Sequence, residues 1–210
     1  MKKLSCYLLI LITFLLIGIN NVDATEIKSM TELNQVLKDA TVSGSTIKLT
    51  KDVSLNSDTI IITTGTYILD LNGFKISSVD GPIKVDGASL TIDDSSSNKT
   101  GLVEATTTTD TKGYSVMLSS GNLTINGGNF GNTPQDKGLD IYGGTAVING
   151  GNIKGKNYGV WTTFWQDIPV DLTITNGTIN SKYGVCVAYQ NTNTDYKLEH
   201  KDSCLYNLYP

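Results

Sequence analysis

The chain falls into three sections by its pattern of apolar and polar residues. An almost unbroken apolar run extends from Leu4 to Ile19. Apolar residues then recur at helical spacing, at positions 30, 33, 36, 37 and 40. Beyond Thr41, apolar and polar residues alternate with a period of two, among many Thr, Ile, Val, Gly and Asn residues. Because successive side chains of a strand point to opposite faces, this last pattern predicts short β-strands.

The alternating section is a degenerate repeat. A phrase of the type Leu-Thr-Ile-Asn-Gly-Gly occurs at residues 69–74, 90–94, 123–130, 146–153 and 172–179. A second phrase, opening with a glycine, lies between the copies and begins at Gly113, Gly138, Gly159 and Gly184. These glycines are 25, 21 and 25 residues apart, and the central isoleucines 125, 148 and 174 are 23 and 26 apart. The two phrases therefore alternate along the chain at nearly the same period, as expected for one repeating structural unit.

The period predicts a parallel β-helix. A strand of three to five residues cannot bury its apolar side alone, whereas stacked coils bury the Leu and Ile of each phrase and leave the intervening Thr outside. A period of 21 to 26 residues accommodates three short strands and three turns. Leucine-rich repeats have similar lengths, but their spaced leucines and helical segment are missing. We expect an all-β solenoid of about six coils over residues 44–190.

The two phrases resemble the right-handed parallel β-helix of the pectin-lyase-like superfamily. They are most similar to adhesin-like secreted and surface proteins of Gram-positive bacteria, and the resemblance covers residues from about 44 to 190. It implies that an N-terminal helix caps the open end of the stack. Residues 29–40 suit this role, since Ser29 and Glu32 form a capping box ahead of the apolar stripe. We assign residues 25–43 to the cap and residues 191–210 to an irregular C-terminal tail or second cap.

Residues 1–24 have the layout of a signal peptide. Two lysines precede the apolar run, and Val22 and Ala24 place small residues at the −3 and −1 positions of a cleavage site. An uncleaved anchor is the alternative, but the run falls short of the ~20 residues that cross a bilayer as a helix. The protein is therefore expected to be secreted, or associated with the cell surface, with no membrane span after cleavage.

The charge and the cysteine content of the chain limit the kinds of ligand and partner that the protein can bind. The chain carries a net charge of −4 and contains no arginine. This argues against nucleic-acid binding, which depends on clustered Lys and Arg. Cleavage leaves Cys186 and Cys204, which either form a disulfide, closing a loop of about 18 residues, or remain unpaired thiols. With His200 as the only histidine, they do not make a zinc site.

Candidate catalytic residues are missing from the repeats. Enzymes of the similar superfamily use clustered acids with an arginine, or paired aspartates with a histidine. This chain lacks arginine, and its histidine lies in the tail. The recurring turn residues Asn72, Asp93, Asn126 and Asn149 are interpreted as a structural ladder rather than as ligands. We predict no catalytic residue, no metal site and no cofactor.

Binding is the better prospect. If the first residue after each repeat glycine points inward, the second and the fourth residues point outward. The second residues form the column Ser115, Asp140, Trp161 and Cys186, and the fourth residues form the column Met117, Tyr142, Thr163 and Ala188. Asp140, Tyr142 and Trp161 then lie together on two coils, with Trp165 nearby. Aromatic faces beside an acid suit sugar rings. The alternative is a structural aromatic patch that covers the loop of residues 164–171.

The sequence therefore predicts a non-catalytic, adhesin-like β-helix that contacts a polysaccharide or a cell-surface glycan. Two alternatives stay open: a degenerate polysaccharide lyase or glycosidase, and a structural fragment of a longer surface protein. Oligomers through the ends of the solenoid belong to the last alternative.

Overall fold

The computed structural model describes residues 25–27, 46–107, 112–132, 134–164, 168–189 and 203–207. Every regular element in these residues is a strand. None of the described segments is a helix long and apolar enough to span a membrane. The predicted signal peptide and the predicted cap helix of residues 29–40 lie outside the described residues.

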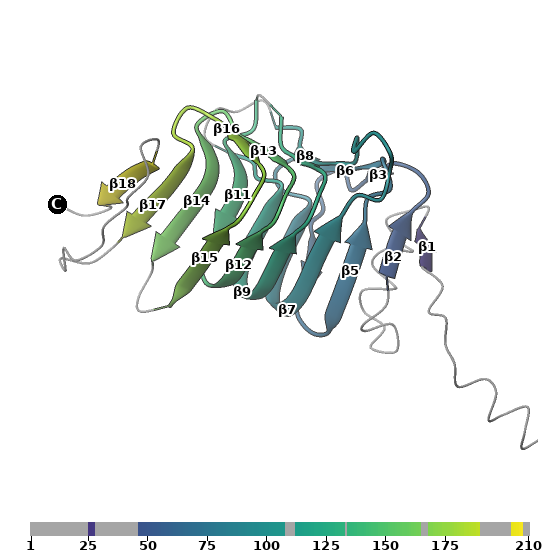
Figure 1. Ribbon diagram of the computed structural model, residues 1–210, viewed down its shortest axis with the longest axis horizontal. Coiled ribbons are helices and arrows are strands. Elements are labelled where there is room, and N and C mark those ends of the chain that lie inside the picture. Colours follow the sequence, from purple (N-terminus) through teal and green to yellow (C-terminus); the bar gives the residue numbers. More distant parts are fainter. Residues whose placement is uncertain are drawn as a thin grey trace, which may run out of the picture.

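The strands stack as successive coils of a parallel β-solenoid (Figure 1). A six-stranded sheet takes one strand from each of six coils, so the described part of the stack has about six turns. The prediction of an all-β parallel β-helix is confirmed. The strands of this sheet are β3 (Val53–Ser54), β6 (Lys75–Ser78), β8 (Leu102–Ala105), β10 (Asn129–Phe130), β13 (Asn152–Lys154) and β16 (Thr178–Asn180).

The remaining strands form a twelve-stranded sheet with two ladders. We call them the first and second faces; β7 (Ile83–Asp93) and β9 (Val116–Ile125) belong to both, one half of each strand lying on each face. The first face also holds β4 (Ile60–Ile62), β11 (Lys137–Ile141), β14 (Tyr158–Phe164), β17 (Val185–Tyr189) and β18 (Ser203–Asn207). The second face also holds β1 (Thr25–Ile27), β2 (Thr46–Leu49), β5 (Thr66–Asp70), β12 (Gly144–Ile148) and β15 (Val170–Ile174).

A column of glycines separates the two faces. Gly87, Gly121 and Gly144 have φ values of 109°, 91° and 84°, in the left-handed region that favours glycine. A Cβ on Gly121 would lie 2.2 Å from the carbonyl oxygen of Ala88 on the preceding coil. The chain therefore changes face at a position that only glycine fits.

The core is made of the repeated Leu and Ile positions. Leu123 and Ile125 are buried, while Thr124 between them points outward and is half-buried, as the alternation predicted. In register, Ile92, Ile125 and Ile148 form one buried column. Among the described residues the column ends at Ile174, which is 42% exposed, and β15 pairs there with β12 alone.

The predicted turn ladder is present, with one correction. Asn149 donates a hydrogen bond to the Oδ1 of Asn126 at 3.2 Å. Ile125 lies opposite Ile92, so the next residues along the two strands, Asn126 and Asp93, lie side by side. Asn72 does not belong to the column, because Asp70 lies opposite Asp93. Asn72 instead adopts a positive φ of 47° and bonds the carbonyl of Leu49.

The predicted register of the glycine phrases is wrong by two residues at its first copy. Leu139 lies opposite Val116, so Met117, not Ser115, lies opposite Asp140. Ser115 is buried and accepts a hydrogen bond from the amide of Gln135, which holds it beside Gly138. In the later coils the phrases align as predicted, with Val160 opposite both Leu139 and Val185.

Candidate functional site

The structure brings together three of the four predicted site residues on the first face. Asp140 on β11 lies opposite Trp161 on β14. Tyr142 follows β11 directly, and its hydroxyl lies 3.4 Å from the Oδ2 of Asp140. The fourth residue, Trp165, lies outside the described residues.

Asp140 is buried rather than displayed on the surface. It is 2% exposed, and Lys137 donates a hydrogen bond to its Oδ2 at 2.7 Å. Its Oδ1 has no hydrogen-bond partner among the described residues. Burial raises the pKa of the Asp140 carboxyl, and the positive charge of Lys137 offsets only part of that rise. A buried, incompletely satisfied carboxyl with a raised pKa is the kind of group that gathers at functional sites.

Two tyrosines beside Asp140 keep their protons. Burial, followed by the charge of Asp140, raises the pKa of Tyr142 to about 12. Burial and the same carboxylate also raise the pKa of Tyr114. The Tyr114 ring packs against Gly81, where a Cβ would lie 2.2 Å from the ring. Both phenols therefore remain hydrogen-bond donors at neutral pH.

Three aromatic rings continue the site across the coils; we call Trp161, Tyr158 and Tyr183 the aromatic strip. The rings of Tyr158 and Trp161 meet edge to face, with centroids 4.4 Å apart and an interplanar angle of 63°. Tyr183 stacks on Tyr158 at 5.4 Å and 29°. Trp161 is fixed further, since its Nε1 donates to the Oγ1 of Thr163 at 2.6 Å.

Two lysines flank the aromatic strip. The Nζ of Lys137 lies 5.5 Å from the Trp161 ring centroid, and that of Lys182 lies 4.8 Å from the Tyr183 ring centroid. Both distances suit cation–π contact. Tyr183 is 37% exposed, so the strip runs from a buried carboxyl at Asp140 to an open ring at its far end.

The sequence analysis missed Lys137, Tyr158 and Tyr183, although a signal was present. Each stands immediately before a repeat glycine, at Gly138, Gly159 and Gly184. Lys137 lies opposite Tyr158 in register, and the backbone N–H of Tyr183 bonds the carbonyl of Asn157. The position before the glycine is therefore a ladder of its own, beside the Asp140 column.

Cys186 occupies the next position of the Asp140 column, opposite Trp161. It is buried and disulfide-bonded. In the register of β17 with β18, Cys204 lies opposite Cys186. Adjacent positions of neighbouring strands have the Cα separation that a disulfide requires. Thr163 and Ala188, from the second predicted column, are opposite each other and buried.

Two buried acids, Asp140 and Asp136, lie beside the aromatic strip. Asp136 accepts a hydrogen bond from Asn157 at 2.7 Å. The described residues contain no group of three or more metal-ligating side chains. Besides the two acids, the described side chains of this region offer stacked rings, phenolic donors and lysine ammonium groups.

The fold defines the chain as a parallel β-solenoid protein. No protein-family model, no curated protein and no solved structure matches it.

Proposed function

We propose that the protein is an exported, non-catalytic β-solenoid that binds carbohydrate on the aromatic strip. The observation that carries this proposal is the cluster of Trp161 and Tyr158 on β14 with Tyr183 of the next coil, beside Asp140. Sugar rings have apolar C–H faces that pack on aromatic rings, and hydroxyls that exchange hydrogen bonds with polar neighbours. Lys137 and Tyr142 supply such neighbours.

The solenoid suits a polymeric ligand. Neighbouring coils are one strand spacing apart, about 4.8 Å, so the rings of β14 and the Tyr183 ring of the next coil are held close together. Weak contacts that repeat along one chain add up to firm attachment. This supports an adhesin-like role, as does the resemblance of the repeat phrases to the pectin-lyase-like superfamily of right-handed β-helices.

Export is part of the proposal. The positive start, the apolar run to Ile19 and the small residues at Val22 and Ala24 support cleavage after Ala24. Secretion by Gram-positive bacteria, or attachment to their surface, is the setting that the resemblance implies. The disulfide at Cys186 is consistent with an oxidising compartment.

One observation favours a second candidate, a degenerate glycosidase. A buried carboxyl with a raised pKa, such as Asp140, has the property of a general acid. Glycoside hydrolysis needs a second carboxylate facing the first across the scissile bond. The neighbouring carboxylate, Asp136, is hydrogen-bonded to Asn157. We therefore rank the glycosidase below carbohydrate binding.

The test is a polysaccharide array probed with the full chain, expressed in an exporting host and purified from the medium. Its N-terminal residue, read by mass spectrometry, should be Thr25. Tyr183→Ala removes the open ring of the strip, and Ile68→Ala is the control, because Ile68 on β5 is also 37% exposed. We expect binding that Tyr183→Ala weakens and Ile68→Ala preserves.

Other results would redirect the assignment. Release of sugar from any bound polymer, abolished by Asp140→Asn, would establish the glycosidase instead. If the wild-type chain binds nothing, the strip is a structural patch and carbohydrate binding is wrong. A mass that rises with concentration would then favour assembly through the solenoid ends.

A further inference from the structure

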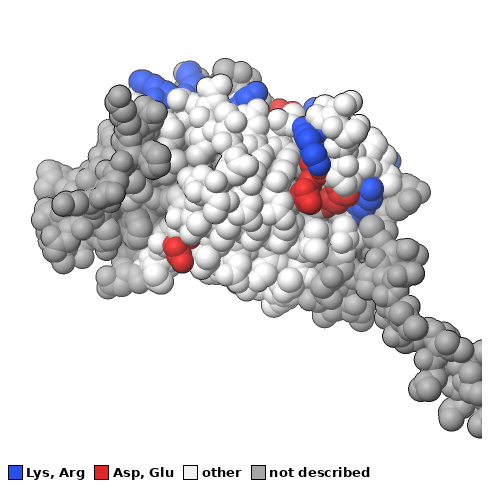
Figure 2. All heavy atoms as spheres, viewed as in Figure 1, with Lys and Arg blue, Asp and Glu red and all other residues white. Residues whose placement is uncertain are grey.

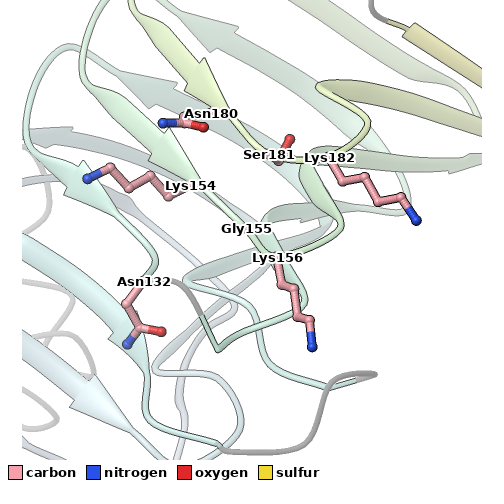
Figure 3. A pocket seen from close by; sticks show the side chains of 7 residues that line it. All are labelled: Asn132, Lys154, Gly155, Lys156, Asn180, Ser181 and Lys182. Atoms are coloured by element: carbon pink, nitrogen blue, oxygen red, sulfur yellow. The ribbon is translucent and has the colours of Figure 1, made fainter.

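A basic cleft lies next to the aromatic strip, where the chain turns after β13 and after β16 (Figure 3). It has a volume of about 340 Å³. Three lysines line it, together with two asparagine amides and a serine. The lining residues are Asn132, Lys154, Gly155, Lys156, Asn180, Ser181 and Lys182. In Figure 3 the three ammonium groups point in different directions around the cleft.

The positive charge of this cleft stands against the net charge of the chain, which is −4. No acid is among the described residues that line it. Glu104 lies beside the lining: it accepts a hydrogen bond from Asn132 and forms an ion pair with Lys75 at 3.3 Å. In Figure 2 several blue side chains lie along the upper edge of the view, whereas the face of β5, β7, β9, β12 and β15 shows few charges.

The cleft and the strip adjoin. Lys182 lines the cleft, and its Nζ lies 4.8 Å from the ring centroid of Tyr183, the open end of the strip. A carbohydrate chain in contact with the exposed part of Tyr183 would therefore bring its next substituent to Lys182. Two contacts on one ligand raise the affinity through their high effective concentration.

We propose that the cleft binds a tetrahedral oxyanion, a sulfate or phosphate ester carried by the carbohydrate that the strip holds. The inference rests on the proposed function and names its ligand class. Lysine ammonium groups are compact point charges with rotatable donors, which suit a tetrahedral group approached from several sides. Planar carboxylates are recognised best by the bidentate fork of arginine, and the chain has no arginine. The amide of Asn180 adds a donor on the same lining, whereas the amide of Asn132 already donates to Glu104 and to the carbonyl of Ala105.

The experiment measures binding of four probes to the purified protein: dextran sulfate, dextran phosphate, carboxymethyl dextran and unmodified dextran. The test variant is Lys154→Gln with Lys182→Gln. The control is Lys51→Gln with Lys84→Gln, which removes the same charge from the first coils of the solenoid. Exposed ion pairs contribute modestly, so the two lysines together should change affinity between about 2-fold and about 30-fold.

We expect the sulfated or the phosphorylated probe to bind more tightly than carboxymethyl dextran. The test variant should lose this advantage and the control variant should keep it. Raising the salt concentration should weaken the advantage, because exposed charges are screened. The stronger of the two probes identifies the ester.

Three results would overturn the inference. Equal binding of carboxymethyl dextran would refute tetrahedral selectivity, and equal losses in both lysine variants would reduce the effect to net charge. Failure of both ester probes would refute the anion site, while the polysaccharide array decides the strip separately. If the ester probes bind through the lysines but Tyr183→Ala changes nothing, the cleft stands and the aromatic strip loses its assigned role.

Discussion

Asp140 should make the stability of the protein fall as the pH rises. Burial raises the pKa of its carboxyl above the ordinary value of 3.8, and Lys137 offsets only part of this. At a pH between the ordinary pKa and the raised pKa, the Asp140 carboxyl keeps its proton in the folded protein, whereas in the unfolded chain it has released the proton. The stabilisation is complete below the ordinary pKa and is lost as the pH rises through the raised pKa. The loss per pH unit is at most about 1.4 kcal/mol, the value for one proton.

The comparison with Asp140→Asn isolates this effect. Other acids act in the opposite sense: burial alone would raise the pKa of Asp70, but hydrogen bonds from Ser95 outweigh it and lower the pKa, so Asp70 stabilises the fold above its ordinary pKa. Asparagine has the shape of aspartate without the charge. The free energy of unfolding of wild type minus that of Asp140→Asn should therefore decline with pH, while contributions from Asp70 cancel.

The assay is urea denaturation in steps between about pH 4 and pH 8, with the free energy of unfolding extrapolated to water. The variant Asp58→Asn, at an exposed aspartate, is the matched control for the substitution itself. If the Asp140→Asn curve runs parallel to wild type throughout, the carboxyl loses its proton at the same pH in the folded and the unfolded chain. The pair with Lys137 would then offset burial in full, and our reasoning about the site would be wrong.

Three further predictions concern the frame that carries the site. Gly121→Ala should lower the free energy of unfolding by more than about 2 kcal/mol, because the φ of Gly121 is 91° and the new Cβ would lie 2.2 Å from a backbone oxygen. Gly127→Ala should cost less, because the nearest atom to its new Cβ is a side-chain atom at 3.1 Å. Thermal unfolding of the two variants tests this difference. Phe130→Ala, which empties a fully buried site, should lower the unfolding free energy by about 3 to 5 kcal/mol in urea titration, and a loss under 1 kcal/mol would contradict the packing described. Cys186→Ser should cost about 3 kcal/mol by loss of its disulfide, and the denatured, unreduced exported chain should offer no thiol to an alkylating agent; a labelled Cys204 would refute the bond to Cys186.

The fold was predictable because each repeat phrase satisfies one local rule. Leu123 and Ile125 face inward because alternate side chains of a strand lie on the same face, and Gly128 follows them with a positive φ of 95°. The coil count follows from the period. Local rules say nothing about how a loop between phrases ends, and there the prediction failed: Ser115 turns inward to Gln135, which shifts the register by two residues.

The candidate site was predictable in part. Asp140 and Trp161 share a register position that the glycine spacing implied. The burial of Asp140 was not predictable, because it depends on Lys137 folding back onto the carboxyl and on Tyr142 lying beside it. An outward position in a strand predicts direction and not exposure, since neighbouring long side chains cover what they surround.

The repeat glycines explain why the aromatic strip lies where it does. A Cβ on Gly159 would lie 2.1 Å from the Cγ2 of Ile179, and one on Gly138 would lie 2.4 Å from the Cγ2 of Ile153, so the six-stranded sheet closes against these positions. Packing fixes the glycine and the inward residue that follows it. The residue immediately before the glycine has no such constraint, and on successive coils it is Lys137, Tyr158 and Tyr183. Backbone pairing then holds these variable side chains one strand apart, which stacks Tyr183 on Tyr158 without any contribution from a ligand. A surface built in this way is organised without a ligand, and it would need little ordering of its own side chains to hold one.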